Sequence, residues 1–413
     1  MVGQFVLGLA VTGPIFMFAD FQLRTLQATD SKNEFQFGDY LGLRLLACLL
    51  AFCITLAVCF VAEFSGQTVL VILFVGLAKA FEAISNTFYG VLQQHERLDR
   101  ITPSVCGHGV LALLSLGLGI YLTGSIVWGA AGFSLSRLIV MLAYDIPSGI
   151  WILRFRLSQT LSERRGRLVC GLDGVRPKCN FRQLKRLVIL GLPLGGTSLL
   201  ISLNTNIPRY FVAEISEYEL GIFGAIAALM AAGITLMRAL DQASCPRLAK
   251  HYAAGETREF RTLFNRLMLL YFTLGITGLA TAWFTGSALL TVLLGLEYAA
   301  YQDVLSYVML AAMTAYFAGA IHTALIVVRC IRAQVPLLFL STLASLTACY
   351  FLVPSNGIAG AALAMTVSKI PFIVVGLVLL RRVTQQRPKP DKTPIVVNEN
   401  FDTLPEGSTR CVG

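Results

Sequence analysis

The 413-residue sequence has little charge: Asp, Glu, Lys and Arg make up 14% of it, whereas hydrophobic residues make up 56%. Soluble domains carry about a quarter charged residues, so this balance indicates a chain that lies largely in lipid. The net charge of +10 does not indicate nucleic-acid binding, because the basic residues gather in a few loops between apolar segments. That distribution is typical of membrane proteins, and we predict no nucleic-acid partner.

Motifs for catalysis, ATP hydrolysis and metal binding are missing as well. The ten cysteines form no CxxC pair and no Cys/His ligand spacing, and the four histidines are scattered without a nucleophile nearby. The sequence contains no glycine-rich phosphate loop of the Walker type. We therefore predict a protein that is not an enzyme and that uses neither a metal nor a cofactor.

Long apolar runs dominate the chain. A bilayer core of about 30 Å needs about 20 apolar residues per helix, and the predicted spans are 2–23, 41–62, 67–92, 102–123, 126–153, 186–213, 219–240, 264–285, 303–328, 333–353 and 357–380. The stretch 286–298 is apolar but too short to cross, so we expect an interfacial or re-entrant segment there. The predicted fold class is all-α, a polytopic membrane protein with about eleven transmembrane helices.

The loops between these spans alternate in charge. One set contains Lys and Arg, and the other set contains neither; the second set is 63–66, 122–126, 214–218, 286–302 and 354–356. The positive-inside rule places the basic loops in the cytoplasm, which predicts a multi-pass bacterial inner-membrane protein with a cytoplasmic C-terminus. Met1 then begins on the outer face without a basic segment before it, so we expect that a preceding helix is missing.

Two short patterns recur between the halves of the chain. Gly3-Gln4-Phe5 is similar to Gly221-Ile222-Phe223, and Gly129-Ala130-Ala131 before Ser136-Arg137 is similar to Gly360-Ala361-Ala362 before Ser368-Lys369. Small-residue triplets also recur by chance in membrane helices, but their agreement with the charge alternation favours a parallel repeat. The predicted organisation is a five-helix N-terminal lobe at 1–153, a basic cytoplasmic linker at 154–186, a six-helix C-terminal lobe at 187–380, and a disordered cytoplasmic tail at 381–413.

One region resembles a known family. Residues 203–255 include Leu-Asn-Thr-Asn-Ile-Pro-Arg-Tyr, Glu-Leu-Gly-Ile-Phe-Gly-Ala and Asp-Gln-Ala-Ser-Cys-Pro-Arg-Leu-Ala. Together with Gly3-Gln4-Phe5 and the loop Glu96-Arg97-Leu98-Asp99, this block resembles the polysaccharide and O-antigen flippases of the multidrug/oligosaccharidyl-lipid/polysaccharide exporter superfamily. The resemblance covers most of residues 1–380, but that family usually has a helix before Gly3.

The resemblance implies two pseudo-symmetric helical bundles around a central cavity. It implies a transporter that flips an undecaprenyl-pyrophosphate-linked oligosaccharide, an O-antigen or exopolysaccharide repeat unit, from the cytoplasmic to the periplasmic leaflet by ion-coupled alternating access. The expected partners are the lipid-linked oligosaccharide, membrane lipids and other polysaccharide-assembly proteins.

Ionisable side chains at membrane depth are costly and face a cavity or a partner. Arg137 and Lys369 hold matching places in the two halves, and we expect these two cations to face each other across the cavity and to bind an anionic cargo. The full set of predicted substrate-binding residues is Arg137, Lys369, Lys79, Arg209, Asn204, Asn206 and His108. For several of them a structural role stays open: an ion pair between Lys79 and Glu82, snorkelling of Arg209, and helix packing by the amides.

Four further charges near predicted cytoplasmic helix ends are expected to act in gating: Asp20, Arg24, Arg238 and Asp241. Glu82 and Asp145 are the predicted ion-coupling residues, although Pro147 makes a structural role equally compatible with Asp145. His108 stands between two glycines, where the resembling family tends to place a permanent cation. Because an imidazole titrates near neutral pH, substrate attraction there is expected to depend on pH.

Three other functions remain open at the level of sequence. A drug or small-molecule exporter of the same superfamily shares the fold, and a fold does not fix the cargo. A membrane polysaccharide polymerase is disfavoured, since it would need a sizeable periplasmic loop with Arg or His, whereas every predicted outer loop is short and free of Lys and Arg. A remnant that no longer transports is the third alternative, because of the missing helix.

Overall fold

The computed structural model describes residues 1–30, 34–95, 97–153, 176–178, 180–328 and 330–385. Within these ranges every regular element is a helix. The helices are α1 (Val2–Ala19), α2 (Leu23–Thr29), α3 (Phe37–Val61), α4 (Gly66–Gln94), η1 (Leu98–Arg100), α5 (Ile101–Thr123), α6 (Ile126–Val140), η2 (Met141–Asp145), α8 (Phe181–Ile215), α9 (Glu217–Ala253), α10 (Thr257–Leu294), η4 (Leu296–Tyr301), α11 (Gln302–Val327) and α12 (Ile331–Gln385).

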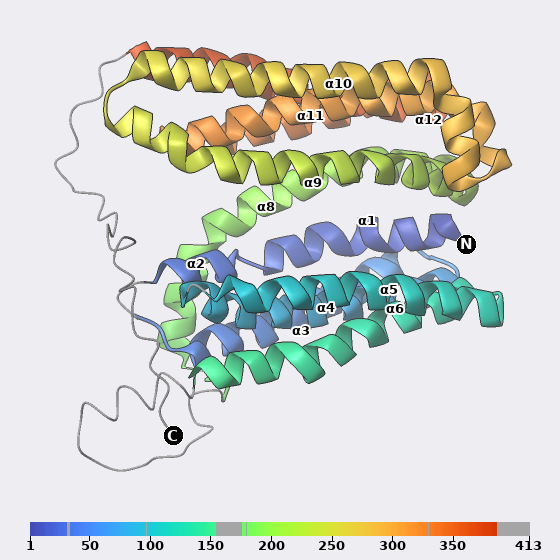
Figure 1. Cartoon of the computed structure of the whole chain (residues 1–413). Coiled ribbons are helices and arrows are strands. Elements are labelled where there is room, and N and C mark those ends of the chain that lie inside the picture. The colour runs from blue at the N-terminus through green and yellow to red at the C-terminus, as the bar shows by residue number, and fades with distance from the viewer. Residues whose placement is uncertain (31–33, 96, 154–175, 179, 329, 386–413) are drawn as a thin grey trace, which may run out of the picture.

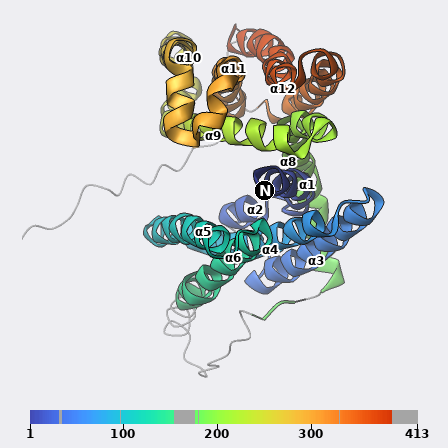
Figure 2. The same ribbon diagram turned by 90° about the vertical axis from the view of Figure 1, so that its right-hand side faces the viewer.

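The helices form two bundles, which we call the amino lobe (α1 to η2) and the carboxy lobe (α8 to α12). In Figure 1 the blue and green helices of one lobe lie below the yellow and red helices of the other. Figure 2 shows α1 between the lobes, where it packs against α8 and α9. The predicted two-bundle architecture is confirmed.

Ten described helices are long and apolar enough to cross a membrane, and the last of them contains two crossings. Gly357 in α12 has φ 55° and ψ −135°, a conformation that L side chains rarely adopt, and it folds the helix into two arms. Counting these arms separately gives the predicted number of about eleven transmembrane helices. Large apolar side chains such as Leu49, Leu113 and Phe284 remain exposed, as is expected of surfaces that face lipid.

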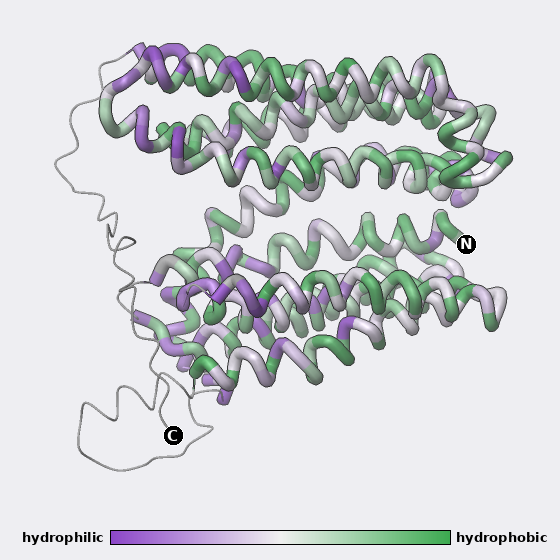
Figure 3. Tube along the Cα trace, in the orientation of Figure 1, coloured by the Kyte–Doolittle hydropathy of each residue, from purple (hydrophilic) through white to green (hydrophobic). Residues whose placement is uncertain are grey.

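Polar residues gather at one end of both lobes, the left end in Figure 3. This end, which we call the basic end, includes α2, η1 and residues 254–256, and both described boundaries of the basic linker lie there. At the opposite end α1 packs closely on α9. There, a Cβ on Gly3 would collide with the backbone of Glu217, so only glycine permits this approach of α1 to α9. The two repeated glycines predicted from the sequence thus touch each other, and Figure 1 shows α1 and α9 diverging toward the basic end.

Some helix limits differ from those predicted. Residues 286–294 continue α10 and are followed by the short helix η4, so the prediction of an interfacial or re-entrant segment at 286–298 was wrong. α8 begins at Phe181, inside the predicted linker, and α12 continues to Gln385, beyond the predicted end at 380. Polar residues at these ends lowered the apolar content without stopping the helix, since backbone hydrogen bonding continues through the interfacial region. Most of the linker and nearly all of the predicted disordered tail lie outside the described residues.

Candidate functional site

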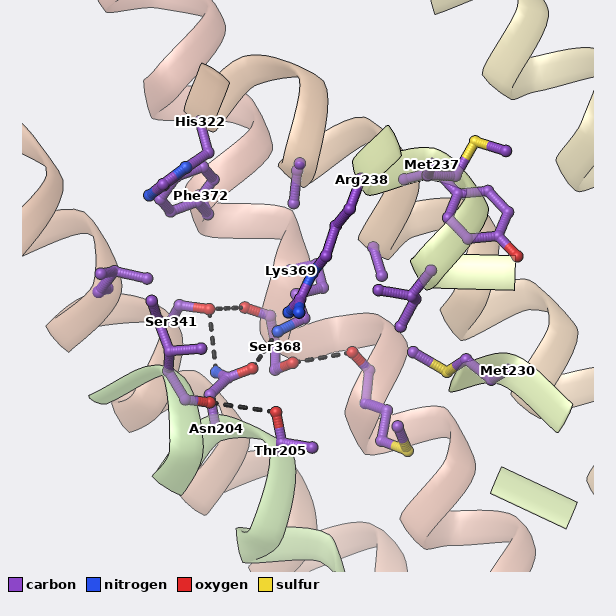
Figure 4. A pocket seen from close by; sticks show the side chains of 18 of the residues that line it. Asn204, Thr205, Met230, Met237, Arg238, His322, Ser341, Ser368, Lys369 and Phe372 are labelled. Atoms are coloured by element: carbon purple, nitrogen blue, oxygen red, sulfur yellow. Dashed lines mark hydrogen bonds between the residues drawn. The ribbon is translucent and has the colours of Figure 1, made fainter. Parts of the chain in front are cut away.

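A cavity of about 370 Å³ lies inside the carboxy lobe, enclosed by α8, α9, α11 and α12. This volume is within the range of ligand pockets, which is about 300–1,000 Å³. The polar residues that line it are Asn204, Thr205, Arg238, Asp241, Tyr316, His322, Thr323, Ser341, Ser368 and Lys369. Figure 4 shows Lys369 and Arg238 pointing into this carboxy-lobe pocket from α12 and α9.

A chain of hydrogen bonds holds the Lys369 side chain at the pocket wall. Its Nζ donates to Asn204 Oδ1, Asn204 Nδ2 donates to Ser341 Oγ at 3.1 Å, and Ser341 Oγ donates to the Ser368 carbonyl at 2.5 Å. Ser341 and Ser368 are on different arms of α12, and the fold at Gly357 brings them together. The ammonium is therefore oriented by a neutral amide and keeps its charge available to the pocket.

The second cation of the pocket, Arg238, is exposed and lies three residues from Asp241 on α9. Asp241 already accepts a hydrogen bond from Tyr271 Oη at 2.6 Å. Among the described residues, no ion pair joins Asp241 or another carboxylate to Arg238 or Lys369. The pocket thus holds two cations against one carboxylate, and this balance favours an anionic ligand.

The position predicted for Arg238 and Asp241 was wrong. The sequence placed them at the end of a helix that closes at residue 240, but α9 runs on to Ala253. Both residues consequently lie within the helix and line the carboxy-lobe pocket. The last turns of α9 contain basic residues and few apolar ones, so the apolar pattern predicted that the helix ends too early.

A compact polar group is buried in the amino lobe around Asp145, which is fully buried in the π-helical turn η2. Ser104 Oγ donates to Asp145 Oδ1, Tyr89 Oη lies 3.5 Å from Oδ2, and His108 Nε2 lies 3.2 Å from Oδ2. His108 Nδ1 is buried and has no hydrogen-bond partner within the described residues. We call Tyr89, Ser104, His108 and Asp145 the amino-lobe cluster.

Arg137 lies near this cluster and outside the carboxy-lobe pocket. It is close enough to Glu82 for an electrostatic interaction, and its guanidinium lies 5.3 Å from the centre of the Phe133 ring. Glu82 forms the predicted ion pair with Lys79 at 3.0 Å. The structure therefore places Arg137 and Lys369 in two separate polar sites, one in each lobe, at similar depth along their helices.

The two asparagines of α8 point toward different lobes. Asn204 joins Lys369 and Ser341 of α12, whereas Asn206 lies against Gly13 of α1. Asn206 Oδ1 accepts a hydrogen bond from Arg209 Nη1 at 2.9 Å. Residues two apart on a helix point in directions about 200° apart, so Asn204 and Asn206 face opposite sides of α8. Asn206 and Arg209 belong to the interface between the lobes, and only Asn204 belongs to the pocket.

Near the basic end, Asp20 and Arg24 have partners that the sequence did not indicate. Asp20 Oδ1 pairs with Arg44 Nη1 at 2.6 Å, and Arg44 Nε also donates to Thr87 Oγ1 at 3.1 Å. Arg24 Nε donates to Gln93 Oε1 at 3.0 Å. Arg44 is only 1% exposed. Sequence reasoning missed it, although an arginine within an apolar span is itself a signal of a buried partner.

The chain is similar over most of its length to a protein that is named for capsular polysaccharide biosynthesis. It is 26% identical over 385 residues to the capsular polysaccharide biosynthesis protein CapF of Staphylococcus aureus, covering 90% of this chain and 89% of that protein. No family model matches the chain.

Solved structures with the same fold are transporters. An inward-facing multidrug resistance MATE family transporter of the MOP superfamily overlaps with a TM-score of 0.69 at 14% identity, covering 93% of both chains. The outward-facing form of such a transporter gives 0.57 at 14% identity, with 94% of this chain and 86% of the other covered. A MOP superfamily transporter from Pyrococcus furiosus gives 0.56 at 15% identity, with the same coverage. The chain therefore has the fold of MOP superfamily transporters.

Proposed function

We propose that the protein is a flippase that carries an undecaprenyl-pyrophosphate-linked oligosaccharide between the leaflets of the bacterial inner membrane. The observation that carries this proposal is the carboxy-lobe pocket, in which Lys369 and Arg238 have no acidic partner among the described residues. A pyrophosphate offers negative oxygens to both cations, and charge-assisted hydrogen bonds of this kind are stronger than neutral ones. Asn204 and Ser341 beside them present groups that suit sugar hydroxyls.

The comparisons support a glycan-related cargo in a different way. The relative in Staphylococcus aureus takes part in capsular polysaccharide biosynthesis by its name, and the fold is that of transporters. The positive-inside rule assigns the basic end, which includes the described end of α12, to the cytoplasm, the side where lipid-linked sugars are assembled.

A drug or small-molecule exporter is the second candidate, because the structures that share the fold include multidrug transporters. The charge of the pocket distinguishes the two functions, since a cationic drug would be repelled by Lys369 and Arg238. For the Pyrococcus furiosus transporter, the reverse polarity of the binding pocket has been taken to suggest a different function. In the same way, the cationic pocket of this chain supports an anionic cargo over a cationic drug.

The test is complementation of a bacterium that lacks its own O-antigen flippase. The strain should regain surface polysaccharide when it expresses this chain, or the chain with an added upstream helix, together with the enzymes that make a compatible repeat unit. Drug resistance is measured in parallel in a strain that lacks its exporters. Verified membrane insertion with increased drug efflux and no surface polysaccharide would favour the exporter.

We further propose that the amino-lobe cluster couples transport to protons. His108 and Asp145 share a buried contact of 3.2 Å in which a proton changes the charge of the pair, whereas Glu82 is already compensated by Lys79 and Arg137. In proteoliposomes, Asp145→Asn should abolish the stimulation of flipping by an imposed proton gradient and leave gradient-free exchange measurable. Glu82→Gln serves as the comparison, and it should retain the stimulation. Full stimulation in Asp145→Asn would contradict the role of the cluster.

A further inference from the structure

We propose that the headgroup of an anionic phospholipid binds between α10 and α12, at the basic end of the carboxy lobe. A second cavity, of about 380 Å³, lies between the beginning of α10 and the end of α12. Arg261 lines it from α10 and Arg381 from α12. This site is separate from the carboxy-lobe pocket and does not depend on the cargo proposed above.

The chemistry of this cavity suits a phosphate ester. Its inner wall is apolar, with Phe264 and Leu380 at 7% and 4% exposure, and both arginines are exposed. Asn265 and Gln385 add amide groups to the lining. Among the described residues, no acidic side chain lines the cavity, and the guanidinium groups of Arg261 and Arg381 form no ion pair or hydrogen bond. Two guanidinium groups without partners at one site would repel each other, and a bound anion removes that repulsion.

The surroundings of the cavity favour a lipid as the source of the anion. On the same two helices, toward the bilayer interior, Leu269, Val374 and Val378 are 63%, 54% and 45% exposed. A phosphate held by the arginines would therefore carry its acyl chains along an apolar surface that already faces lipid. Basic pockets between transmembrane helices at the bilayer surface bind anionic headgroups in this way.

A headgroup at this position would also link α10 and α12, two helices whose packing is mediated by their shared neighbours α9 and α11. α11 packs against both α10 and α12, and the cavity occupies the space between these two at the basic end. A phosphate that contacts Arg261 and Arg381 at once would link the first turns of α10 to the last turns of α12. We therefore expect the bound lipid to stabilise the carboxy lobe.

Native mass spectrometry of the full chain in detergent tests the site. Phosphatidylglycerol should bind with a defined stoichiometry and raise the thermal unfolding midpoint, whereas phosphatidylcholine should do neither. Loss of both arginines in the double variant Arg261→Gln/Arg381→Gln should weaken phosphatidylglycerol binding by about tenfold or more. Both arginines are exposed, so the apolar core is left intact.

The matched control is Arg266→Gln/Arg382→Gln, which removes the same charge from the same helices at exposed positions outside the cavity. This control should bind phosphatidylglycerol as the unmodified chain does. Equal losses in both double variants would show non-specific attraction to the basic end and would overturn the proposal. Displacement of the lipid by millimolar inorganic phosphate would also overturn it, in favour of a site for a free anion.

Discussion

Replacing Lys369 with glutamine should reduce flippase activity by about tenfold to a hundredfold, the range expected when a hydrogen bond to a charged group is lost. The lysine contributes one of the two cations of the carboxy-lobe pocket and is oriented by Asn204. Glutamine is one atom shorter than lysine but keeps a polar N–H donor and removes the charge, so a neutral hydrogen bond near Asn204 remains feasible while the attraction for pyrophosphate is lost. The measurement is surface polysaccharide in the complemented strain, supported by flipping of a fluorescent lipid-linked oligosaccharide in proteoliposomes.

Two further variants make the Lys369 result specific. Arg238→Gln removes the other pocket cation and should give a similar loss, and the double variant should be more severe than either. Lys250→Gln serves as the control, because Lys250 is exposed on α9 and does not line the pocket. Normal polysaccharide export by Lys369→Gln and Arg238→Gln, at normal membrane levels, would remove the basis for an anionic cargo in this pocket.

Arg137 provides a comparison between the lobes. The sequence predicted that Arg137 and Lys369 act together in one cavity, whereas the structure places Arg137 beside Glu82 in the amino lobe. If the carboxy-lobe pocket alone binds the pyrophosphate, Arg137→Gln should change substrate affinity less than Lys369→Gln does. Measuring the apparent affinity of both variants in the same proteoliposome assay decides whether the cargo contacts one lobe or both.

Replacing Asp20 with asparagine should destabilise the protein by about 3 kcal/mol, because it leaves a buried arginine without its counter-charge. Arg44 is 1% exposed and forms its only described ion pair with Asp20 at 2.6 Å. We place the effect at the lower end of the range for broken buried pairs because the Asp20 side chain is 31% exposed. Thermal unfolding in detergent, followed by intrinsic fluorescence or aggregation, measures the change.

The same experiment separates a structural role of Asp20 from the gating role predicted from sequence. The double variant Asp20→Asn/Arg44→Leu removes both charges and should recover part of the lost stability. Asp99→Asn, which breaks the exposed pair with Arg97, should leave the unfolding midpoint nearly unchanged. Unaltered stability of Asp20→Asn, combined with lost transport, would instead assign the pair to gating.

The membrane character of the chain could be predicted with few errors, because each helix must satisfy its backbone internally and bury about twenty apolar residues in lipid. These requirements act on consecutive residues, so the sequence alone is enough to recognise the membrane-spanning helices. The predicted helix ends were less accurate at 240 and 380, where helices continue through polar residues, and at 285, where α10 continues through a short apolar stretch.

The pairing of charges could not be predicted, because partners such as Asp20 and Arg44 are distant in sequence and meet only when α1 packs against α3. The near pair Lys79 and Glu82 was anticipated, since three residues along a helix bring side chains to the same face. In the same way, Arg238 and His322 come into one pocket with Lys369 because α9, α11 and α12 enclose it.

The residue pattern was sufficient to predict the all-helical membrane fold, about eleven crossings, the two bundles and the gathering of basic residues at one end. Helix packing in three dimensions was needed to show which ionisable residues share a site: Lys369 with Arg238 and Asp241, and His108 with Asp145, whereas Arg137 does not line the pocket of Lys369. The physical reason is that hydrophobicity and helix periodicity are local properties of the chain. The neighbours of a buried charge depend instead on helix rotation and on folds such as that at Gly357, which long-range packing sets.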